Sequence, residues 1–450
     1  MKFYGKTVLV YGYGKSGVSA SELLLRNGAR VLVWDDDKDA LALVSEKSGA
    51  VRMCAAELAG VDLVVVSPGV PFDTPMLLEA RLRGIRVISE IELGFTFSDA
   101  ELIAVTGTNG KTTVSMLIYA MLKEAGRAVK LLGNSGNPFC NEAEALTENT
   151  TAVVEASSFQ LRGIRHFAPD IAVFLNLEED HLDYHKDFWE YAGAKLRIFE
   201  NQSESDAAVI NDDDKRLREL TENLKARKIR FGSTARSDAY ALDDGVFYKG
   251  ERLFDVASIR LRGAHNLSNV LAATAVAMES GVHPCAIKRA VENFLPARYR
   301  NEFIGTAGNK KIFNDSKGTN VASTVTAARA AEGETVLILG GSDKGEDFSR
   351  LFASLPKNVI YAVVTGDNAP SVIEGALKAG FLKLSHRATL FDALEYAVSL
   401  PVKNVLFSPA SASFDRYVSY AERGEDFSRL ASGLKDFVPS GLPVYDGDAH

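Results

Sequence analysis

Cysteine is scarce in this sequence. Only Cys54, Cys140 and Cys285 occur among 450 residues, and their odd number and wide spacing exclude a disulfide framework. They predict reduced thiols in a cytosol rather than a zinc site. Apolar runs are short, and a stretch such as Leu63–Val66 suits a strand but not a membrane helix. The amino terminus enters a predicted strand at once and lacks a signal-peptide core, so we expect a cytoplasmic protein that does not insert into membranes.

The sequence also has no excess of basic residues. The formal net charge of −8 at pH 7 argues against nucleic acid or another polyanion as the main partner. Hydrophobic residues make up 46% and charged residues 24%, which is ordinary for a globular protein. Because 450 residues exceed one core, we expect two to three α/β domains. Strand and helix patterns divide the chain into blocks 1–93, 94–296 and 297–450.

A strand, a glycine-rich turn and a helix follow one another between Leu102 and Lys123. An apolar run ends in Gly107–Thr113 (GTNGKTT), and apolar residues then recur every three to four positions. Such a turn directs backbone N–H groups and the positive end of a helix at one anion. Lys111 adds a cation, and Thr112 or Thr113 adds a hydroxyl for Mg²⁺. A chance turn explains the glycines but not Lys-Thr-Thr at the helix start, so we predict a nucleoside triphosphate site.

The first block alternates strands with helices and predicts a parallel sheet covered by helices. The predicted strands are 7–11, 29–34, 61–67 and 85–89, and the predicted helices are 19–27 and 74–82. Gly12–Gly17 (GYGKSG) is a full G-x-G-x-x-G after the first strand, and Asp35 and Asp36 follow the second. These are the parts of a dinucleotide fingerprint, so an NAD-dependent oxidoreductase is one interpretation.

The residues themselves do not single out NAD. They predict a diphosphate at a helix N-terminus with an acid nearby, and any nucleotide diphosphate fits that description. A glycine-rich turn that binds nothing is the remaining alternative. Ser67-Pro68-Gly69 ends the third strand at the same carboxyl edge, where ligands of such sheets bind.

The second block places chemically active side chains at two neighbouring strand ends. Glu155 ends one predicted strand and His181 follows the next, and both could ligate a divalent ion beside the triphosphate. His181 and His185 have a zinc-like spacing, but Leu182 stands where a zinc protease carries its Glu, so we do not favour zinc. A solvated loop is the favoured interpretation for most of the other acids nearby, which are Glu178, Glu179, Asp180 and Asp183.

The third block again alternates predicted strands with predicted helices. Its predicted strands are 311–314, 335–340, 359–365 and 404–408. Gly345–Leu351 (GEDFSRL) recurs at Gly424–Leu430, which we interpret as two similar helix starts and not as a repeat architecture. We expect a disordered tail at Val444–His450.

Several motifs identify this chain with a known family. They are GTNGKTT at 107–113, EASSFQL at 155–161, NLEEDHLDYH at 176–185, AKLRIFE at 194–200, GAHNLSN at 263–269, DSKGTN at 315–320 and SPASASFD at 408–415. In this order they resemble the Mur ligases, which amidate a carboxylate using ATP, over essentially the whole chain. The last motif, the first block and the length are most similar to the branch that adds D-glutamate to UDP-N-acetylmuramoyl-L-alanine. The resemblance implies a Rossmann-like first domain, a P-loop-type ATPase domain, a Rossmann-like third domain, and a monomer acting on small molecules in peptidoglycan synthesis.

The resemblance also implies ligand contacts. ATP would contact Gly107, Thr108, Asn109, Gly110, Lys111, Thr112, Thr113, Asn266, Asn269, Arg298, Asp315 and Lys317. The UDP substrate would contact Gly14, Lys15, Ser16, Asp35, Asp36, Ser67, Pro68, Gly69, Asn134 and Ser157. D-glutamate would contact Thr319, Lys344, Ser413, Phe414 and Tyr420. Two Mg²⁺ ions would lie at Thr112, Thr113, Glu155, His181 and Lys195, and the catalytic residues would be Lys111, Glu155, His181 and Lys195.

Lys195 corresponds to a lysine that carries a CO₂-derived carbamate in the family. The pattern of 192–199 alone, an amphipathic helix, would put Lys195 on its solvated face. Only a neutral amine adds CO₂, so the site must lower the pKa of Lys195 from its usual value of about 10.4. The implied reaction proceeds through an acyl phosphate shielded from water. We expect the third domain to swing over the second about a hinge near Phe294–Arg298.

Departures from the family pattern are local. Ala297 stands where relatives often carry His, and Tyr420 stands where Phe is frequent. Three alternatives stay open: an NAD oxidoreductase, an ATP-binding module without activity, and a sibling ligase that adds L-alanine, a diamino acid, or glutamate to folate.

Overall fold

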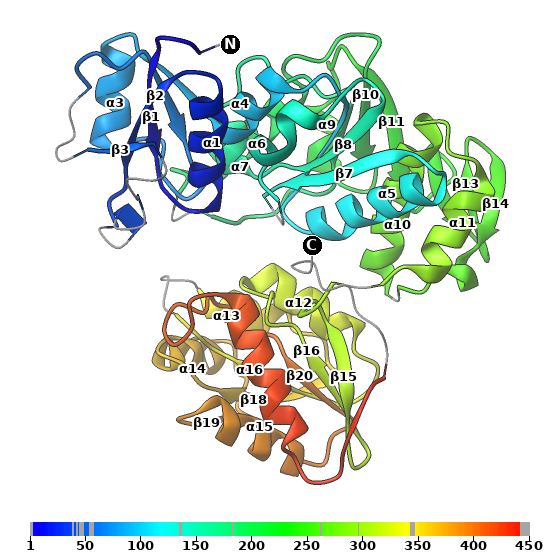
Figure 1. Ribbon diagram of the computed structural model, residues 1–450. Helices are drawn as coiled ribbons and strands as arrows, with labels where there is room; N and C mark the ends of the chain where they lie inside the picture. The colour runs from blue at the N-terminus through cyan, green and yellow to red at the C-terminus, as the bar shows by residue number, and fades with distance from the viewer. Residues whose placement is uncertain are drawn as a thin grey trace. The chain divides into compact units, whose positions relative to one another are not determined.

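The computed structural model describes most of the chain. The described residues are 3–37, 40–41, 44, 49–53, 58–134, 137–181, 184–261, 263–295, 297–342 and 347–441. The chain falls into two compact units, residues 1–260 with 266–294, and residues 261–265 with 295–450. In the described ranges, the first unit holds a five-stranded and a nine-stranded sheet and the second a seven-stranded sheet (Figure 1). These sheets lie inside the three predicted blocks, whose exact boundaries stay predictions. No helix among these residues is long and apolar enough to cross a membrane.

The amino-terminal sheet is parallel, in the order β3-β2-β1-β4-β5. Its elements are β1 Thr7–Tyr11, α1 Lys15–Arg26, β2 Arg30–Trp34, β3 Val51–Arg52, β4 Leu63–Val66, α3 Pro75–Leu82, β5 Arg86–Ser89 and α4 Glu90–Phe97. Alternate side chains of β1 bury on opposite faces: Val8 and Val10 pack with α1, and Leu9 and Tyr11 pack with α3 (Figure 1). The predicted parallel sheet is therefore confirmed. Helix α1 starts earlier than predicted, at Lys15 within the Gly12–Gly17 motif.

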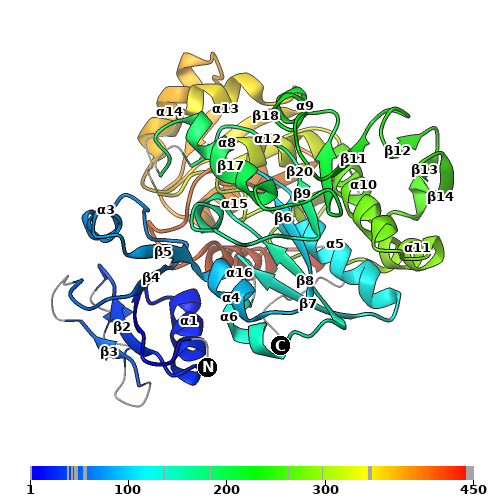
Figure 2. The ribbon, with the colours of Figure 1, turned by 90° about the horizontal axis from the view of Figure 1, so that it is seen from above.

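The central sheet has the order β14-β13-β12-β11-β10-β9-β6-β8-β7. Its strands are β6 Glu101–Thr106, β7 Ala128–Gly133, β8 Thr150–Glu155, β9 Ile171–Phe174, β10 Ala207–Asn211, β11 Arg227–Gly232, β12 Ala239–Leu242, β13 Gly245–Tyr248 and β14 Glu251–Asp255. Its helices are α5 Lys111–Glu124, α6 Phe139–Glu142, α7 Ser158–Leu161, α8 Phe188–Leu196, α9 Lys215–Leu220, α10 Ala264–Glu279 and α11 Pro284–Asn293, with 3₁₀ turns η2 Ala143–Ala145, η3 Arg197–Phe199 and η4 Val256–Ser258. Ala104 of β6 packs with Leu161 of α7 and Tyr191 of α8. Helix α5 contacts β7, β8 and α11 (Figure 2).

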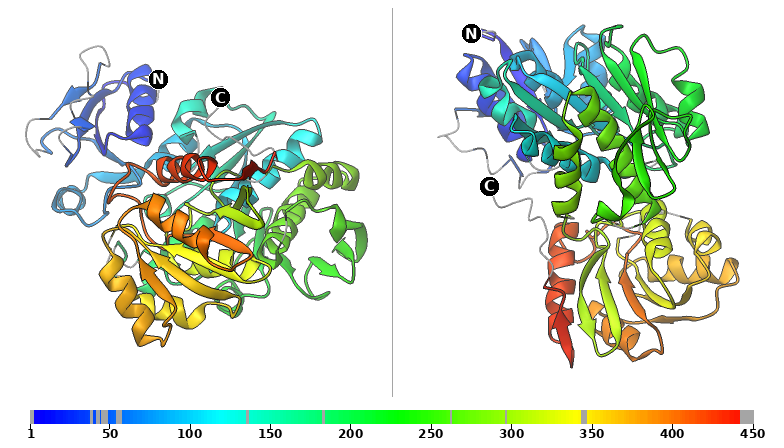
Figure 3. Two further views of the ribbon diagram at one scale, coloured as in Figure 1. Left: turned by 90° about the horizontal axis from the view of Figure 1, so that it is seen from below. Right: turned by 90° about the vertical axis from the view of Figure 1, so that its right-hand side faces the viewer.

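The third sheet has the order β19-β18-β17-β20-β16-β15-β21, with β15 and β21 antiparallel at one edge. Its elements are β15 Glu302–Ala307, β16 Lys310–Asn314, α12 Val321–Ala330, β17 Thr335–Leu339, α13 Phe348–Ser354, β18 Val359–Val364, α14 Ala369–Lys378, β19 Leu384–His386, α15 Leu390–Ser399, β20 Asn404–Phe407, α16 Tyr420–Ser432 and β21 Phe437–Pro439. Leu337 and Leu339 point to the face covered by α12, α13 and α14. Helices α15 and α16 cover the other face of this sheet (Figure 3), and Val336 and Ile338 pack with them there.

One prediction for the third block was wrong. Asp347 caps α13, so the first GEDFSRL copy does precede a helix, but the second copy lies inside α16. The side chain of Ser419 accepts a hydrogen bond from the Glu422 N–H, so this helix begins before the motif. A Cβ on Gly424 would lie 2.4 Å from the Tyr299 ring, which explains a glycine in a helix interior. Predicted residues Lys344 and 444–450 lie outside the described residues.

Candidate functional site

The carboxyl ends of the central strands bring distant motifs together. Strand β6 pairs in parallel with β8 and β9, so Val105 lies opposite Glu155 and Thr106 opposite Phe174. The turn after β6 is bonded to the loop after β9. The Asn109 N–H donates to Asn176 Oδ1 (2.8 Å), and the Glu178 N–H donates to Thr108 Oγ1 (3.0 Å). GTNGKTT and NLEEDH thus form one rigid edge.

The glycines of the GTNGKTT turn are required by the backbone. Gly110 has φ +84° and caps α5, and a Cβ there would lie 2.5 Å from Asn269 Oδ1. Gly107 has φ +154°, and a Cβ there would lie 2.9 Å from the Leu175 side chain. Since Gly110 has no side chain to cap them, the first N–H groups of α5 can serve an anion. Asn269, which also hydrogen-bonds Asn266 (3.3 Å), packs against this turn.

Glu155 is the buried acid of this edge. It is 3% exposed, and its two carboxylate oxygens accept hydrogen bonds from Thr112 Oγ1 (2.7 Å) and Asn134 Nδ2 (3.0 Å). Thr113, half-buried, follows Thr112 at the start of α5. A carboxylate and a hydroxyl side by side are hard oxygen ligands of the kind Mg²⁺ prefers.

Lys195 lies on the buried side of α8. Its side chain is 1% exposed, its Nζ donates to the Gly107 carbonyl (2.8 Å), and it stands 4.8 Å from the centre of the Tyr191 ring. Lys111 Nζ donates to the same carbonyl oxygen (2.9 Å) and to that of Thr108 (2.9 Å). Burial first, and then the charge of Lys111, hold the pKa of Lys195 well below its ordinary value. The amphipathic pattern is therefore wrong about exposure, because tertiary packing covers this face.

His181 stands at the rim of the site. Its φ of +54° is unusual for a residue with a side chain, and its ring lies 4.9 Å from that of Phe159. His181 Nε2 is 3.6 Å from Asp180, whose side chain is only 14% exposed. Glu178 and Glu179 are exposed in their loop, as expected for most of these acids, whereas Asp180 is partly buried. Asp183 and Leu182 lie outside the described residues.

His185 is a buried neutral ring. Its Nε2 is 3.0 Å from Ser158 Oγ, and burial lowers its pKa to about 4. Ser157, 7% exposed, caps α7 in a capping box with Gln160. These contacts order the strand end beside Glu155.

The glycine turn of the first domain is tightly built. A Cβ on Gly17 would lie 1.9 Å from the Gly12 carbonyl oxygen, which also accepts from Ser67 Oγ (2.7 Å). Lys15 is exposed and Ser16 half-buried at the start of α1, next to the exposed Gly14. Pro68 and Gly69 follow Ser67 at the same edge, as predicted.

Asp35 and Asp36 already have partners inside the first domain. Asp35 Oδ2 accepts from the Tyr13 N–H (2.6 Å), and Asp36 Oδ2 accepts from the Tyr11 hydroxyl (2.6 Å). Burial and Asp36 raise the pKa of Tyr11 to about 12. The two acids predicted to bind a nucleotide therefore also stabilise the end of β1 and the turn that follows it.

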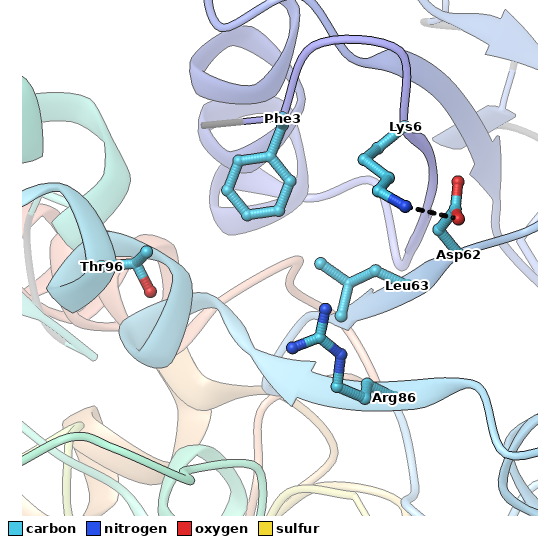
Figure 4. A pocket seen from close by; sticks show the side chains of 6 residues that line it. All are labelled: Phe3, Lys6, Asp62, Leu63, Arg86 and Thr96. Carbon is cyan, nitrogen blue, oxygen red and sulfur yellow. Dashed lines mark hydrogen bonds and ion pairs between the residues drawn. The ribbon is translucent and has the colours of Figure 1, made fainter. Parts of the chain in front are cut away.

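The first and central domains meet at their ligand edges. Tyr184 Oη donates to the Val70 carbonyl (3.0 Å), which follows Ser67–Gly69, and Arg162 pairs with Glu190 (2.9 Å) beside the Tyr184 ring. A cavity of about 170 Å³ lies at the opposite edge, where β1, β4 and β5 begin, and its Lys6 is paired with Asp62 at 3.1 Å (Figure 4). That cavity is not part of the candidate site, because ligands of parallel sheets bind at the carboxyl ends.

In the second unit, the ends of β16 and β20 gather another set of predicted residues. Asp315 is buried, accepts from Ser408 Oγ (2.6 Å) and the Asn301 N–H (2.9 Å), and burial raises its pKa to about 7. Lys317 Nζ lies 3.8 Å from the centre of the Tyr420 ring. The other predicted residues here lie as follows: Thr319 is half-buried on the same loop as Lys317, Ser413 is buried, Phe414 is 70% exposed, and Arg298 stacks at 4.9 Å on Tyr299. Nothing in the structure bears on Ala297.

Comparison with known proteins agrees with this geometry. Residues 105–277 match the Mur ligase middle domain, and residues 6–89 match the Mur ligase MurD-like N-terminal domain. The chain is 39% identical to UDP-N-acetylmuramoylalanine–D-glutamate ligases of Bacillus cereus (strain AH187) and Bacillus mycoides (strain KBAB4), over 96% of this chain and 99% of each relative. The chain belongs to the Mur ligase family. The resemblance seen in the motifs is thereby confirmed.

Solved Mur ligase structures share the fold. MurC from Thermotoga maritima aligns with a TM-score of 0.61 at 20% identity over 94% of this chain and 98% of that one. MurF from Acinetobacter baumannii aligns with a TM-score of 0.62 at 19% identity over 89% and 91%. These matches confirm the predicted three-domain α/β architecture.

Two residues of this Mur ligase escaped the sequence analysis. Tyr191 lies four residues before Lys195 on α8, and its hydroxyl is 3.0 Å from Thr108 Oγ1. The i, i+4 spacing to a functional lysine was the available signal. Arg423, which is buried, directly precedes the second GEDFSRL copy.

Proposed function

We propose that this chain is an ATP-dependent ligase that joins D-glutamate to the L-alanyl carboxyl group of UDP-N-acetylmuramoyl-L-alanine in peptidoglycan precursor synthesis. The observation that carries the proposal is the 39% identity, over nearly the full length, to relatives named for this reaction. The contacts around Glu155, Lys111 and Lys195 support it, because a structural fold alone has no need of a buried acid and a buried amine at one P-loop-like turn.

The GTNGKTT turn is proposed to bind the triphosphate of ATP. The N-terminus of α5 provides a fixed positive helix end, and Lys111 can leave the carbonyl oxygens of Gly107 and Thr108 to meet a phosphate. Asn269 packs on the turn and, with Asn266, is proposed to meet adenine. Asp315, Lys317 and Arg298 are proposed to complete the nucleotide site from the second unit.

The residues present fit Mg²⁺. Glu155 and Thr112 offer hard oxygen ligands in contact with each other, Thr113 adds a second hydroxyl, and His181 adds a nitrogen at the rim. When bound, Mg²⁺ neutralises phosphate charge as a Lewis acid. Asn134 orients the Glu155 carboxylate through its other oxygen.

Lys195 fits a CO₂-derived carbamate. Its buried environment favours the neutral amine, which is the form that adds CO₂, and the Gly107 carbonyl holds that amine in place. In carbamate form the side chain would carry a negative charge next to Lys111. We propose that this anion helps to organise the metal ligands.

The proposed reaction takes place in two steps. The L-alanyl carboxylate of the substrate attacks the γ-phosphorus of ATP, so that an acyl phosphate forms and ADP leaves. The neutral amine of D-glutamate then attacks the acyl carbon, and inorganic phosphate leaves as the amide forms and a proton is released. Lys111 stabilises the charge on the transferred phosphoryl oxygens.

We propose that the first domain binds the UDP part at Gly14–Ser16, Asp35, Asp36 and Ser67–Gly69, and that Asn134 and Ser157 meet the muramoyl part. The second unit is proposed to take D-glutamate at Thr319, Lys344, Ser413, Phe414 and Tyr420. We further propose that the protein is a cytoplasmic monomer, that the second unit closes about Phe294–Arg298, and that its product serves cell-wall growth, cell shape and division.

An amino-acid screen tests this function. Purified protein is incubated with ATP, Mg²⁺ and UDP-N-acetylmuramoyl-L-alanine, and phosphate release is followed with D-glutamate, L-glutamate, L-alanine or L-lysine. Only D-glutamate is expected to give phosphate together with an amide product. Turnover with another amino acid would assign a sibling activity, and NADH binding that competes with the UDP substrate would revive the oxidoreductase interpretation.

A further inference from the structure

Arg423 is a buried guanidinium in α16 that the proposed function has not used. It is 2% exposed. Its Nε donates to Ser316 Oγ (3.1 Å), one Nη donates to the Ala412 carbonyl (2.9 Å), and the other donates to the carbonyls of Ser316 (2.9 Å) and Ser411 (3.0 Å). One side chain therefore bonds two loops that are about a hundred residues apart in the chain.

These loops carry the residues proposed to bind the amino-acid donor. The loop after β16 holds Ser316 and Thr319, and the loop after β20 holds Ser411 to Phe414. A third loop packs on the same group, because a Cβ on Gly341 would lie 2.9 Å from an Arg423 nitrogen and 2.2 Å from the Ala412 carbonyl oxygen. That third loop leads in sequence to Lys344.

The chemistry of the acceptors is unusual. In the described part of the chain, the hydrogen bonds of Arg423 end on three carbonyl oxygens and one hydroxyl, and none ends on a carboxylate. Burial lowers the pKa of Arg423 to about 10, so the group stays charged at neutral pH. The Asp415 and Asp315 carboxylates lie near enough to favour the charged form of Arg423 without a hydrogen bond to it. An apolar side chain could fill the same space but could not donate to the backbone carbonyls of two loops, so the planar fork of donors indicates a role in holding these loops together.

We infer that Arg423 is a positioning residue for the amino-acid donor: it holds the loop after β16, the loop after β20 and the Gly341 backbone packed against it in one geometry. This inference rests on the proposed function, since the donor-binding role of the loops belongs to it. Arg423 acts through Ser316, Ser411 and Ala412 and does not touch the reacting atoms.

The test compares R423K and R423M with R429M. Arg429 lies on the same helix, is 70% exposed at its side chain and pairs with Asp426, so R429M controls for the loss of an arginine from α16. Steady-state kinetics give kcat and the KM values for D-glutamate, ATP and the UDP substrate, and thermal melting checks folding. We expect R423M to raise the KM for D-glutamate roughly tenfold or more, and the KM for ATP by less than about twofold. R423K should fall between R423M and wild type, because lysine keeps the charge but not the planar fork of donors, and R429M should match wild type.

Two outcomes overturn the inference. One is an equal rise in all three KM values, which a merely structural role would give. The other is an unchanged KM for D-glutamate in R423K, which also decides the matter if R423M does not fold. Failure of the proposed function is a separate result: wild-type protein would then form no amide with D-glutamate.

Discussion

Replacing Glu155 by Gln separates the charge of this side chain from its shape. In the native site one carboxylate oxygen accepts from Thr112 Oγ1 at 2.7 Å and the other from Asn134 Nδ2 at 3.0 Å. Gln can keep both contacts, because its amide oxygen accepts from Asn134 and its NH₂ donates to the Thr112 hydroxyl, which can also accept. The free energy of unfolding should therefore change by less than about 1 kcal/mol.

Activity should respond very differently. The negative charge is lost where Mg²⁺ and the transferring phosphoryl group are proposed to lie, so kcat should fall roughly 10²- to 10³-fold, the size found when one stabilising group is removed from a transition state. Glu155→Ala should lose activity and also about 1–3 kcal/mol of stability, because Asn134 and Thr112 lose their acceptor. Amide formation is followed by chromatography of the UDP product, and stability by urea unfolding.

Glu148→Gln is the matched control, since Glu148 is an exposed acid just before β8, the strand that ends at Glu155. It should retain activity within about threefold, as is usual for a surface substitution. If Glu155→Gln retains activity at the level of Glu148→Gln, the carboxylate has no electrostatic role and the reasoning fails. A large loss of stability in Glu155→Gln would equally refute the hydrogen-bond exchange.

Three further perturbations test other parts of the structure. Lys195→Met should abolish ligase activity yet stabilise the fold at pH 7 by about 1–4 kcal/mol, because burying Lys195 requires the amine to give up its proton or its hydration and an apolar chain avoids that cost. Because the folded state lowers the pKa of Lys195, the unfolded chain binds more protons, and the stability of the wild type should rise with pH. The stability advantage of the Met variant should therefore shrink by pH 9. Urea unfolding of the two proteins in CO₂-free buffer, at pH 7 and pH 9, measures these differences. Asp315→Asn should flatten the pH dependence of stability. In the wild type, folding raises the pKa of the Asp315 carboxyl to about 7, so the free energy of unfolding should fall as pH rises from about 4 towards 7. A parallel decline in both proteins would contradict this. Gly17→Ala should weaken UDP binding roughly tenfold or more while ATP binding persists, because a Cβ 1.9 Å from the Gly12 carbonyl forces the turn open. Calorimetry measures the affinity for each nucleotide. Equal losses of affinity for UDP and ATP would show that the two domains do not bind them separately.

Much of the fold was predictable because it is encoded locally. Strand β1 has the predicted bounds, since a buried apolar strand is visible in a short window. The glycines of both turns were predictable for the same reason, because their role depends on the backbone. Family motifs then indicated the chemistry of residues that periodicity alone could not distinguish from surface polar groups.

What escaped prediction depends on contacts between distant segments. Lys195 is read as solvated from its helix alone, and only the packing of α8 under the GTNGKTT turn buries it. The second GEDFSRL copy lies inside α16 because Ser419 begins that helix earlier. Arg423 has no local signature of burial, since its partners come from loops far away in the chain.

The carbonyl oxygen of Gly107 accepts hydrogen bonds from two amines, those of Lys111 and Lys195. The charge of Lys111 lowers the pKa of Lys195 and so makes its protonation less favourable. A substitution that removes the charge of Lys111 should therefore let Lys195 keep its proton more readily, which opposes the addition of CO₂. The effects of substituting the two lysines singly will consequently not sum to that of the double variant.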